Sequence, residues 1–388
     1  MTADYVLPLN DPQATLAVVG GKGASLARLA QAGLPVPGGF HITTAAYDAC
    51  VAANALARGI GAALASADAA QPATLEAASQ LIQAAFAQAV MPAGIADAIT
   101  GAYASLAPDA VAVRSSATAE DLPDLSFAGQ QETFLNVLDL PDLLDKVKRC
   151  WASLWTARAI GYRLQHGIDH SSVSLAVVVQ RLVAAEAAGV LFTAHPVTGA
   201  RDQAMLTATW GLGEAIVGGL VTPDTLTLEK LSGRVLTRAT ADKQVMTVRL
   251  ASGTAEQPVP AALRRAPVLS DAQAAQLTDL GCQIEALYGM PMDIEWALAD
   301  GHFTLLQARP ITALPAAEPP AMPPPTEWRL PRGAYAAVRN NIVELMADPL
   351  SPLFATLGLS AINASLHHIM NESFAMRGIM PDEIIIAV

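Results

Sequence analysis

A change of pattern near residue 110 most constrains how this chain folds. Before it the sequence is alanine-rich and poor in charge, and predicts helices over residues 44–66, 73–90 and 93–105. After it, short apolar runs bounded by turn residues predict strands up to about residue 312. Two further helices are predicted among these strands, over residues 141–165 and 270–288. Helices and strands therefore occupy largely separate parts of the chain.

The composition fits a large packed interior. Of the 388 residues, 52% are hydrophobic and 15% charged, which predicts two to three domains and argues against general disorder. Lys and Arg number 23 against 35 Asp and Glu, for a net charge of -12. Most of the surface should therefore repel polyanions, which argues against nucleic acid or a membrane as partner. A local cationic pocket could still bind a small anion.

Signals for export, disulfides or structural zinc are missing from the sequence. Cys50, Cys150 and Cys282 lie far apart without a CxxC spacing, and the first residues lack a basic and apolar leader. A cytoplasmic location is therefore expected. The uncharged stretch 77–96 is long enough to span a membrane, but its Ser, Gln and Pro residues favour buried amphipathic helices.

The composition shifts sharply after Thr312. Residues 313–327 are rich in proline and predict an extended linker that follows a first domain over 1–312. Residues 328–388 predict a short, mainly helical segment, the start of an acceptor-binding or helical domain. Because the last residues, 384–388, are an apolar run without a polar cap, we expect this segment to be truncated.

The first candidate site is the glycine-rich turn over residues 19–25, VGGKGAS. It opens a predicted helix and presents Lys22 at the helix N-terminus. Free backbone N–H groups and the helix dipole there both favour an anionic ligand. The alternative is a plain strand-turn-helix junction with a solvated lysine.

The second candidate site follows a predicted strand that ends in VRSSATAED. Arg114 in this buried strand needs an anionic partner, since an unpaired desolvated cation is costly. That partner is either Glu120 or Asp121, or a phosphate. A small loop around Gly129 would allow a close approach of backbone to ligand.

The third candidate site lies on two predicted neighbouring strands. Asp293 and Glu295 share a face of one strand, and Gln307 and Arg309 share a face of the other. Two carboxylates and an amide oxygen suit Mg²⁺ that also holds phosphate oxygens, and Arg309 adds a bidentate phosphate donor. The alternative is a solvated ladder of cross-strand ion pairs, each worth about 0.2 to 1 kcal/mol.

The loop between these two strands decides whether their polar faces coincide. A three-residue loop over 299–301 would place Asp293 opposite Gln307 on one face, and a two-residue loop would place them on opposite faces. Gly301 in a left-handed position favours the three-residue loop.

Together these stretches resemble the N-terminal nucleotide-binding domain of phosphoenolpyruvate synthase, pyruvate phosphate dikinase and rifampicin phosphotransferase. The resemblance spans roughly residues 10–312 and rests on blocks in the same order: GGKGASLARL, GLPVPGGF, VAVRSSATAEDLPDLSFAGQQETFLNV, VVVQRLV, GVLFTAHPVTG, WGLGEAIVGGLVTPD, and DIEWAL with LLQARPI. It implies an α+β fold of the ATP-grasp type, in which two lobes with a helical insertion clamp ATP and Mg²⁺.

The resemblance also implies roles for individual residues. The cations that would hold phosphates and take part in catalysis are Lys22, Arg114 and Arg309. The residues that would cover the phosphates are Gly129, Gln130 and Thr133. The residues of the adenine-facing segment are Gln180 and Leu182. The Mg²⁺ ligands would be Glu295 and Gln307, with Asp293 near by. Matches to a further glycine-rich loop of the family are Gly211, Gly213 and Glu214.

In this family, a histidine on a separate swivelling domain takes the β-phosphate of ATP and passes it to an acceptor. The Thr-Ser-His-Ala type motif of that domain does not occur in the 388 residues. We therefore expect a dikinase-type phosphotransferase that needs a histidine domain from a longer or separate chain.

Residues 340–354 resemble the opening of the acceptor-binding domain that rifampicin phosphotransferase-like proteins insert, which favours an ansamycin-like acceptor. One alternative is phosphoenolpyruvate synthase, which acts on pyruvate. Another is a non-catalytic ATP-binding module left by gene fission.

Overall fold

The computed structural model of the chain describes residues 4–107, 109–118, 132–217, 219, 221–312 and 314–315. By its internal contacts the chain divides into residues 1–319 and 320–388, and every described residue lies in the first unit. The predicted site residues Gly129 and Gln130, and the predicted C-terminal segment, lie outside the described residues. The predicted domain boundaries therefore stay a prediction.

Two large antiparallel sheets and a separate hairpin make up the strands of the described part. The five-stranded sheet has the order β1 (Val6–Pro8), β2 (Gly39–Ile42), β5 (Leu175–Arg181), β3 (Val111–Ala117) and β4 (Thr133–Val137). The six-stranded sheet has the order β13 (His302–Pro310), β12 (Met292–Ala299), β6 (Ala187–Phe192), β7 (Gln203–Trp210), β8 (Asp224–Glu229) and β9 (Val235–Ala239). The hairpin joins β10 (Val245–Arg249) to β11 (Thr254–Pro258). Together with the helices, these sheets confirm the predicted α+β class.

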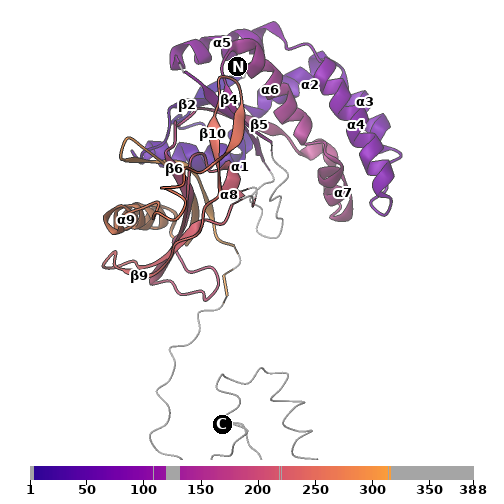
Figure 1. Cartoon of the computed structure of the whole chain (residues 1–388). Helices are drawn as coiled ribbons and strands as arrows, with labels where there is room; N and C mark the ends of the chain where they lie inside the picture. Colours follow the sequence, from indigo (N-terminus) through magenta and orange to yellow (C-terminus); the bar gives the residue numbers. More distant parts are fainter. Residues whose placement is uncertain are drawn as a thin grey trace, which may run out of the picture. The chain divides into compact units, whose positions relative to one another are not determined.

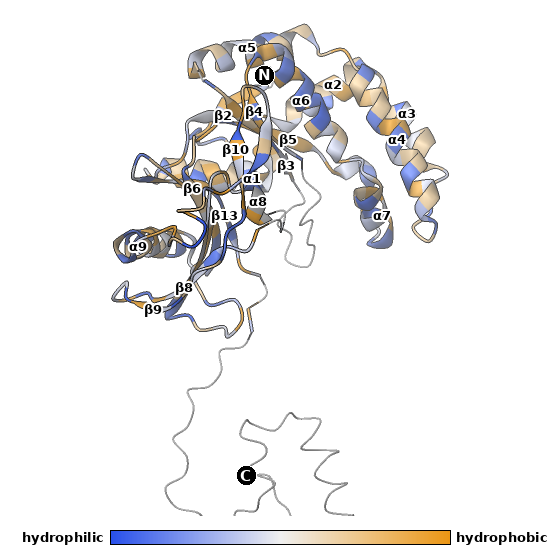
Figure 2. Cartoon of the chain, in the orientation of Figure 1, coloured by the Kyte–Doolittle hydropathy of each residue, from blue (hydrophilic) through white to orange (hydrophobic). Residues whose placement is uncertain are grey.

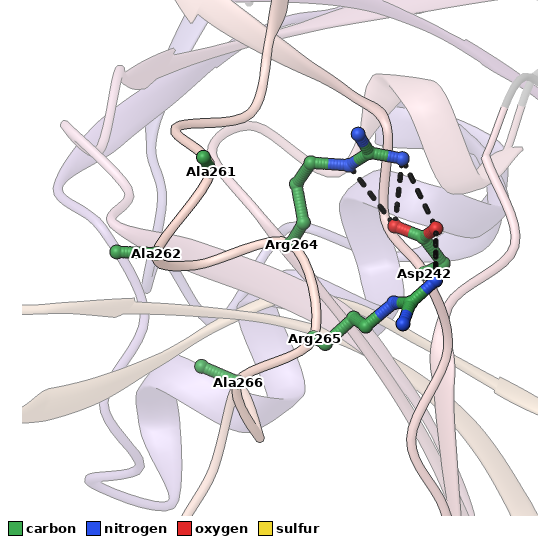
Figure 3. Close-up of a pocket in the computed structure, with 6 residues that line it drawn as sticks. All are labelled: Asp242, Ala261, Ala262, Arg264, Arg265 and Ala266. Carbon is green, nitrogen blue, oxygen red and sulfur yellow. Dashed lines mark hydrogen bonds and ion pairs between the residues drawn. The ribbon is translucent and has the colours of Figure 1, made fainter.

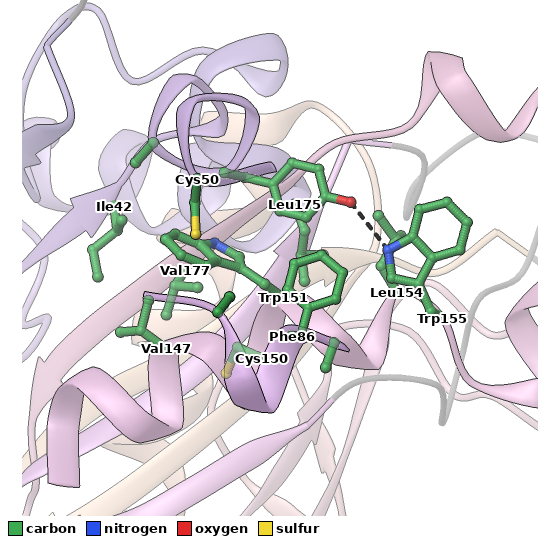
Figure 4. Packing of buried hydrophobic residues seen from close by; sticks show 14 of the residues in the cluster. Ile42, Cys50, Phe86, Val147, Cys150, Trp151, Leu154, Trp155, Leu175 and Val177 are labelled. Atoms are coloured by element: carbon green, nitrogen blue, oxygen red, sulfur yellow. Dashed lines mark hydrogen bonds between the residues drawn. The ribbon is translucent and has the colours of Figure 1, made fainter. Parts of the chain in front are cut away.

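One face of the five-stranded sheet packs against a set of helices, which Figure 1 shows beside it: α2 (Thr44–Ala53), α3 (Leu56–Leu64), α4 (Pro72–Gln88), α5 (Ala93–Leu106), α6 (Leu140–Ser153) and α7 (Ala157–Gln165). Because side chains alternate along a strand, Val111 and Val113 point into this core. Trp151 of α6 lies fully buried at its centre, close to Cys50 and Phe86 (Figure 4). The opposite face of the five-stranded sheet does not take part in this core.

Two predicted helices are each broken in the structure. The predicted helix 44–66 ends as α2 and restarts as α3 after Ala55, whose φ is 50°. The predicted helix 141–165 restarts as α7 at Thr156, whose hydroxyl accepts a hydrogen bond from the Ala159 amide. Hydrophobic periodicity continues across both breaks, so the pattern alone does not reveal them.

The uncharged stretch 77–96 forms parts of α4 and α5. Leu75, Ile82 and Phe86 of α4 are buried in the first core, as expected for an amphipathic helix, and Figure 2 shows apolar residues along α3 and α4. Among the described helices, none by itself is long and apolar enough to cross a membrane. Helices α4 and α5 reach the length and apolar composition of a membrane span only when they are taken together, and a bend of 76° separates them.

Helix α1 (Leu16–Gln31) connects the two large sheets. Leu26 packs against Val178 on the free face of the five-stranded sheet, while Leu29 belongs to the core of the six-stranded sheet. The other side of that second core is formed by α9 (Asp271–Tyr288), which confirms the predicted helix 270–288 and begins at a Ser270–Gln273 capping box. Residues 182–186 run directly from β5 of one sheet to β6 of the other. The two sheets therefore face each other across α1.

Candidate functional site

The glycine-rich turn is bonded to the middle of the five-stranded sheet. Gly20 interrupts α1 with φ 70°, and a Cβ atom there would lie 2.2 Å from the Ser116 carbonyl oxygen, so only glycine fits. The buried Ser116 hydroxyl donates to the Val19 carbonyl at 2.7 Å and accepts from the Gly23 amide at 3.0 Å. The break places half-buried Lys22 in the first turn of the second helical segment, where anions are favoured.

Arg114 joins the two sheets. It lies on the same face of β3 as Ser116, the face that α1 covers. Its Nη2 atom donates to Glu295 Oε2 at 2.9 Å, and its Nη1 atom donates to the Leu306 carbonyl at 2.8 Å. The two ion-paired side chains are only 13% and 24% exposed. Of the carboxylates in the described residues, the partner of Arg114 is thus Glu295 of β12. The predicted alternatives are a phosphate and either Glu120 or Asp121, and these two carboxylates lie outside the described residues.

The loop between β12 and β13 differs from the predicted one. Ala299 pairs with His302, so the loop has two residues, Asp300 and Gly301, with φ of 49° and 74°. Positive φ at both positions is typical of the type I′ turn that suits a tight hairpin. The predicted three-residue loop is wrong because Asp-Gly accommodates this shorter turn without strain.

A β-bulge brings the polar side chains to one face despite the shorter loop. The register shifts between Glu295 and Trp296, so that Glu295 lies opposite Gln307 and Leu306 is left without a partner in the ladder. Asp293 consequently lies opposite Arg309, and not opposite Gln307 as predicted. The bulge also presents the Leu306 carbonyl that accepts the hydrogen bond of Arg114.

The oxygen atoms of this face suit a magnesium ion. Glu295 supplies a carboxylate and Gln307, opposite it, an amide oxygen, both of which are hard ligands. Among the described residues, no group of three or more His, Cys, Asp or Glu side chains could hold a metal ion. Two protein ligands agree with the usual behaviour of Mg²⁺, which keeps its other positions for water and substrate phosphates.

Asp293 is less suited to be a metal ligand. Arg309 binds it through Nε at 2.9 Å and Nη2 at 2.8 Å. Burial raises the pKa of Asp293, and the Arg309 guanidinium offsets this only in part. The place of Asp293 near the metal stays a prediction, and its carboxylate already serves to orient Arg309, which is half exposed.

Gln180 and Leu182 lie at the start of the connection between the sheets. Gln180 pairs with Ala112 and so shares the face of Arg114; it is 3% exposed, and its Nε2 atom has no hydrogen-bond partner. Buried amide donors are normally satisfied, so this one is a candidate to bind a ligand acceptor. The Leu182 amide already donates to the Ala110 carbonyl at 2.9 Å.

The structure thus brings several predicted residues together. Arg114 contacts Glu295, which lies opposite Gln307, and Thr133 lies opposite Arg114 on β4. Two residues that hold this arrangement, Ser116 and Leu306, are not apparent from the sequence, because neither a bridging hydroxyl nor a bulge follows a periodic pattern.

A surface pocket of about 460 Å³ lies elsewhere (Figure 3). It contains none of the predicted site residues and is lined by Asp242, Ala261, Ala262, Arg264, Arg265 and Ala266. Arg264 and Arg265 both form ion pairs with Asp242, which partly neutralises their charge.

Comparison with known proteins shows the family of this chain. Residues 16–327 match the family model of the pyruvate phosphate dikinase AMP/ATP-binding domain. The chain belongs to this family. The resemblance found in the sequence is therefore confirmed.

Relatives of this dikinase-family chain are named as enzymes of the phosphotransferase type. A probable phosphoenolpyruvate synthase of Methanothermobacter thermautotrophicus is 46% identical over 303 residues, which cover 76% of this chain and 44% of the relative. A rifampicin phosphotransferase of Streptomyces sviceus is 42% identical over 374 residues, which cover 95% of this chain and 42% of the relative. The chain thus spans less than half the length of either relative.

A buried histidine lies beneath the glycine-rich turn of this AMP/ATP-binding domain. His41 is fully buried on β2, its Nε2 atom contacts the Leu9 carbonyl at 3.1 Å, and its Nδ1 atom has no partner. A Cβ atom on Gly23 would lie 3.2 Å from Nδ1, so the ring packs directly against the turn. Burial disfavours the imidazolium and lowers the pKa of His41 to about 4.

We expect His41 to make stability pH-dependent. Above its unfolded pKa of 6.5 the ring is neutral in both states, so it adds no pH dependence. Between pH 6.5 and 4 the unfolded state binds a proton that the native state excludes, which should cost about 3 kcal/mol in total. Urea unfolding of wild type and His41→Gln across this range measures the difference. The variant should lose less stability on acidification, while His302→Gln, at an exposed site, should follow wild type. Parallel curves for wild type and His41→Gln would contradict the assignment.

Proposed function

We propose that this chain binds Mg²⁺-ATP between its two large sheets in an ATP-grasp arrangement, as the nucleotide-binding part of a dikinase-type phosphotransferase. The observation that carries this proposal is the contact between Arg114 of one sheet and Glu295 of the other, with Gln307 opposite Glu295. Without nucleotide the phosphate-binding cation and the metal-binding carboxylate neutralise each other. With nucleotide, a phosphate would take the place of Glu295 beside Arg114, and Mg²⁺ would take the place of Arg114 beside Glu295.

The other side chains have matching roles in this proposal. Lys22 at the helix start and Arg309 on β13 would hold phosphates by charge-assisted hydrogen bonds. The unpartnered Nε2 atom of buried Gln180 would donate to a ring nitrogen of adenine. Bound Mg²⁺ would neutralise charge that develops on the transferred phosphoryl group. Catalysis by this domain would consist mainly of positioning and charge neutralisation.

The share of this chain that each alignment covers favours a rifampicin phosphotransferase-like protein. Alignments with two Streptomyces rifampicin phosphotransferases cover 95% and 91% of this chain, whereas those with phosphoenolpyruvate synthases cover 76%. The additional similarity includes residues beyond the dikinase domain match, where an acceptor-binding segment is proposed. An ansamycin-like acceptor is therefore preferred over pyruvate, and a histidine domain would come from a longer or separate chain.

The test is a thermal shift measurement with ATP, AMP and GTP, each with and without Mg²⁺. At a hundredfold excess over Kd, ATP should stabilise the protein by about 2.7 kcal/mol, a rise in Tm of about 5 °C for a domain of this size. The shift should need Mg²⁺ and be smaller with GTP, because the Gln180 amide is placed for an adenine acceptor. A folded protein without any nucleotide-dependent shift would overturn the proposal.

A further inference from the structure

The β10–β11 hairpin belongs to neither large sheet, but it is rooted in the six-stranded one. Just before β10, fully buried Lys243 forms an ion pair of 2.5 Å with Asp224 at the start of β8. Just after β11, the Val259 amide donates to the Gln244 carbonyl. The two ends of the hairpin are therefore held together and fixed on the second sheet.

The middle of the hairpin lies against the glycine-rich loop 211–214. The Leu212 amide donates to the Thr247 carbonyl at 2.9 Å, and the Thr254 hydroxyl donates to Glu214 Oε2 at 3.1 Å. Gly211 has φ 76°, and a Cβ atom there would lie 2.3 Å from the Thr247 carbonyl oxygen. This close approach means that the hairpin determines where the loop can lie.

The tip of the hairpin reaches the other sheet. Asn136 of β4 donates both amide hydrogens, to the Leu250 carbonyl at 2.8 Å and the Gly253 carbonyl at 2.7 Å. Asn136 is 3% exposed and has φ 60°, a conformation that asparagine tolerates better than most residues. It lies three positions after Thr133, which is opposite Arg114. A buried side chain beside the candidate site thus fastens an otherwise exposed turn.

We propose that the β10–β11 hairpin is a strap between the two sheets and that Asn136 is the positioning residue that fastens it. With the strap fastened, the loop 211–214 is held in place as a cover for the bound nucleotide. When Asn136 releases the tip, the strap keeps one long hydrogen bond toward the first sheet, from Arg249 Nη2 to the Asp109 carbonyl at 3.4 Å, and the loop loses most of its support. This inference rests on the proposed nucleotide site, but the strap itself can be tested without nucleotide.

The test replaces Asn136 with Gly, which tolerates the positive φ and removes the side chain together with its amide. Trypsin cleavage after Arg249, beside the tip, reports release of the strap in the ligand-free protein. Two lost hydrogen bonds should make this cleavage about tenfold faster and weaken ATP binding by about tenfold. The matched control is Asn54→Gly, because Asn54 also donates to two carbonyls, those of Cys50 and Val90, away from the hairpin. Asn54→Gly should change neither the rate of cleavage after Arg249 nor the affinity for ATP.

Each outcome decides the inference. Unchanged cleavage in Asn136→Gly would overturn the strap, and faster cleavage with unchanged ATP affinity would overturn the positioning role. If wild type binds no ATP while Asn136→Gly is cleaved faster, the strap stands and the proposed function fails. Should Asn136→Gly not fold, Asn136→Asp keeps the size of the side chain and places a carboxylate against two carbonyl oxygens, and the same two readouts apply.

Discussion

Replacing Lys243 with Met is expected to lower the free energy of unfolding by about 3 to 5 kcal/mol. Lys243 and Asp224 are both 0% exposed and form an ion pair of 2.5 Å. Asp224 also accepts hydrogen bonds from the amides of Ala241 and Val268, so its charge is fully paired inside the second sheet. Met fills a similar volume but leaves the carboxylate buried without a cation. Urea denaturation at pH 7 measures the loss.

Two further variants separate this explanation from a simple packing defect. Lys230→Met makes the same change in an ion pair with Glu285 whose side chains are 15% and 25% exposed, so solvent screens the loss to about 1 kcal/mol or less. The double variant Asp224→Asn/Lys243→Met removes both charges and should recover about half of the lost stability, because an amide replaces only part of the hydrogen bonding. If the double variant were as unstable as Lys243→Met, an uncompensated charge would not be the cause.

Local signals in the sequence predict those parts of the fold that depend on neighbouring residues. The start of α9 is predicted at residue 270, where the structure shows a Ser270–Gln273 capping box that depends only on neighbouring residues. The break at Ala55 is not predicted, because alanine favours helix and only the packing of α2 and α3 imposes its positive φ. The hairpin β10–β11 is also absent from the prediction, since its strands have little buried surface and its contacts come from distant residues.

The candidate site likewise combines features that local sequence predicts with features that depend on residues far apart in the chain. Strand periodicity predicts that Asp293 and Glu295 share a face and that Gln307 and Arg309 share a face. That the two faces coincide is confirmed, but the three-residue loop from which it was predicted is wrong. The bulge at Leu306 restores the register, and its carbonyl is stabilised by Arg114 from the other sheet. A contact between residues so far apart in the chain has no local signal. Roles for single residues therefore come from the family resemblance, and their positions come from the structure.

The largest effect on ligand binding is expected for Glu295→Gln. The amide keeps the size of the side chain but removes the charge that would attract Mg²⁺, so the affinity for ATP in the presence of Mg²⁺ should fall by about 10- to 100-fold. Affinity without Mg²⁺ should change little, or rise, because Arg114 loses its carboxylate partner and becomes available to a phosphate. Calorimetric titration of ATP at several Mg²⁺ concentrations measures both effects.

A matched control distinguishes metal binding from loss of the ion pair. Glu285 is 25% exposed and paired with Lys230, much as Glu295 is 24% exposed and paired with Arg114. Glu285→Gln should therefore lower stability by a similar small amount while leaving the Mg²⁺ dependence of ATP binding intact. If Glu295→Gln kept the full Mg²⁺ dependence, Glu295 would be only a structural partner of Arg114, and the metal site would have to be sought on other residues of the chain. A selective loss in Glu295→Gln would instead place the metal on the face that the Leu306 bulge creates.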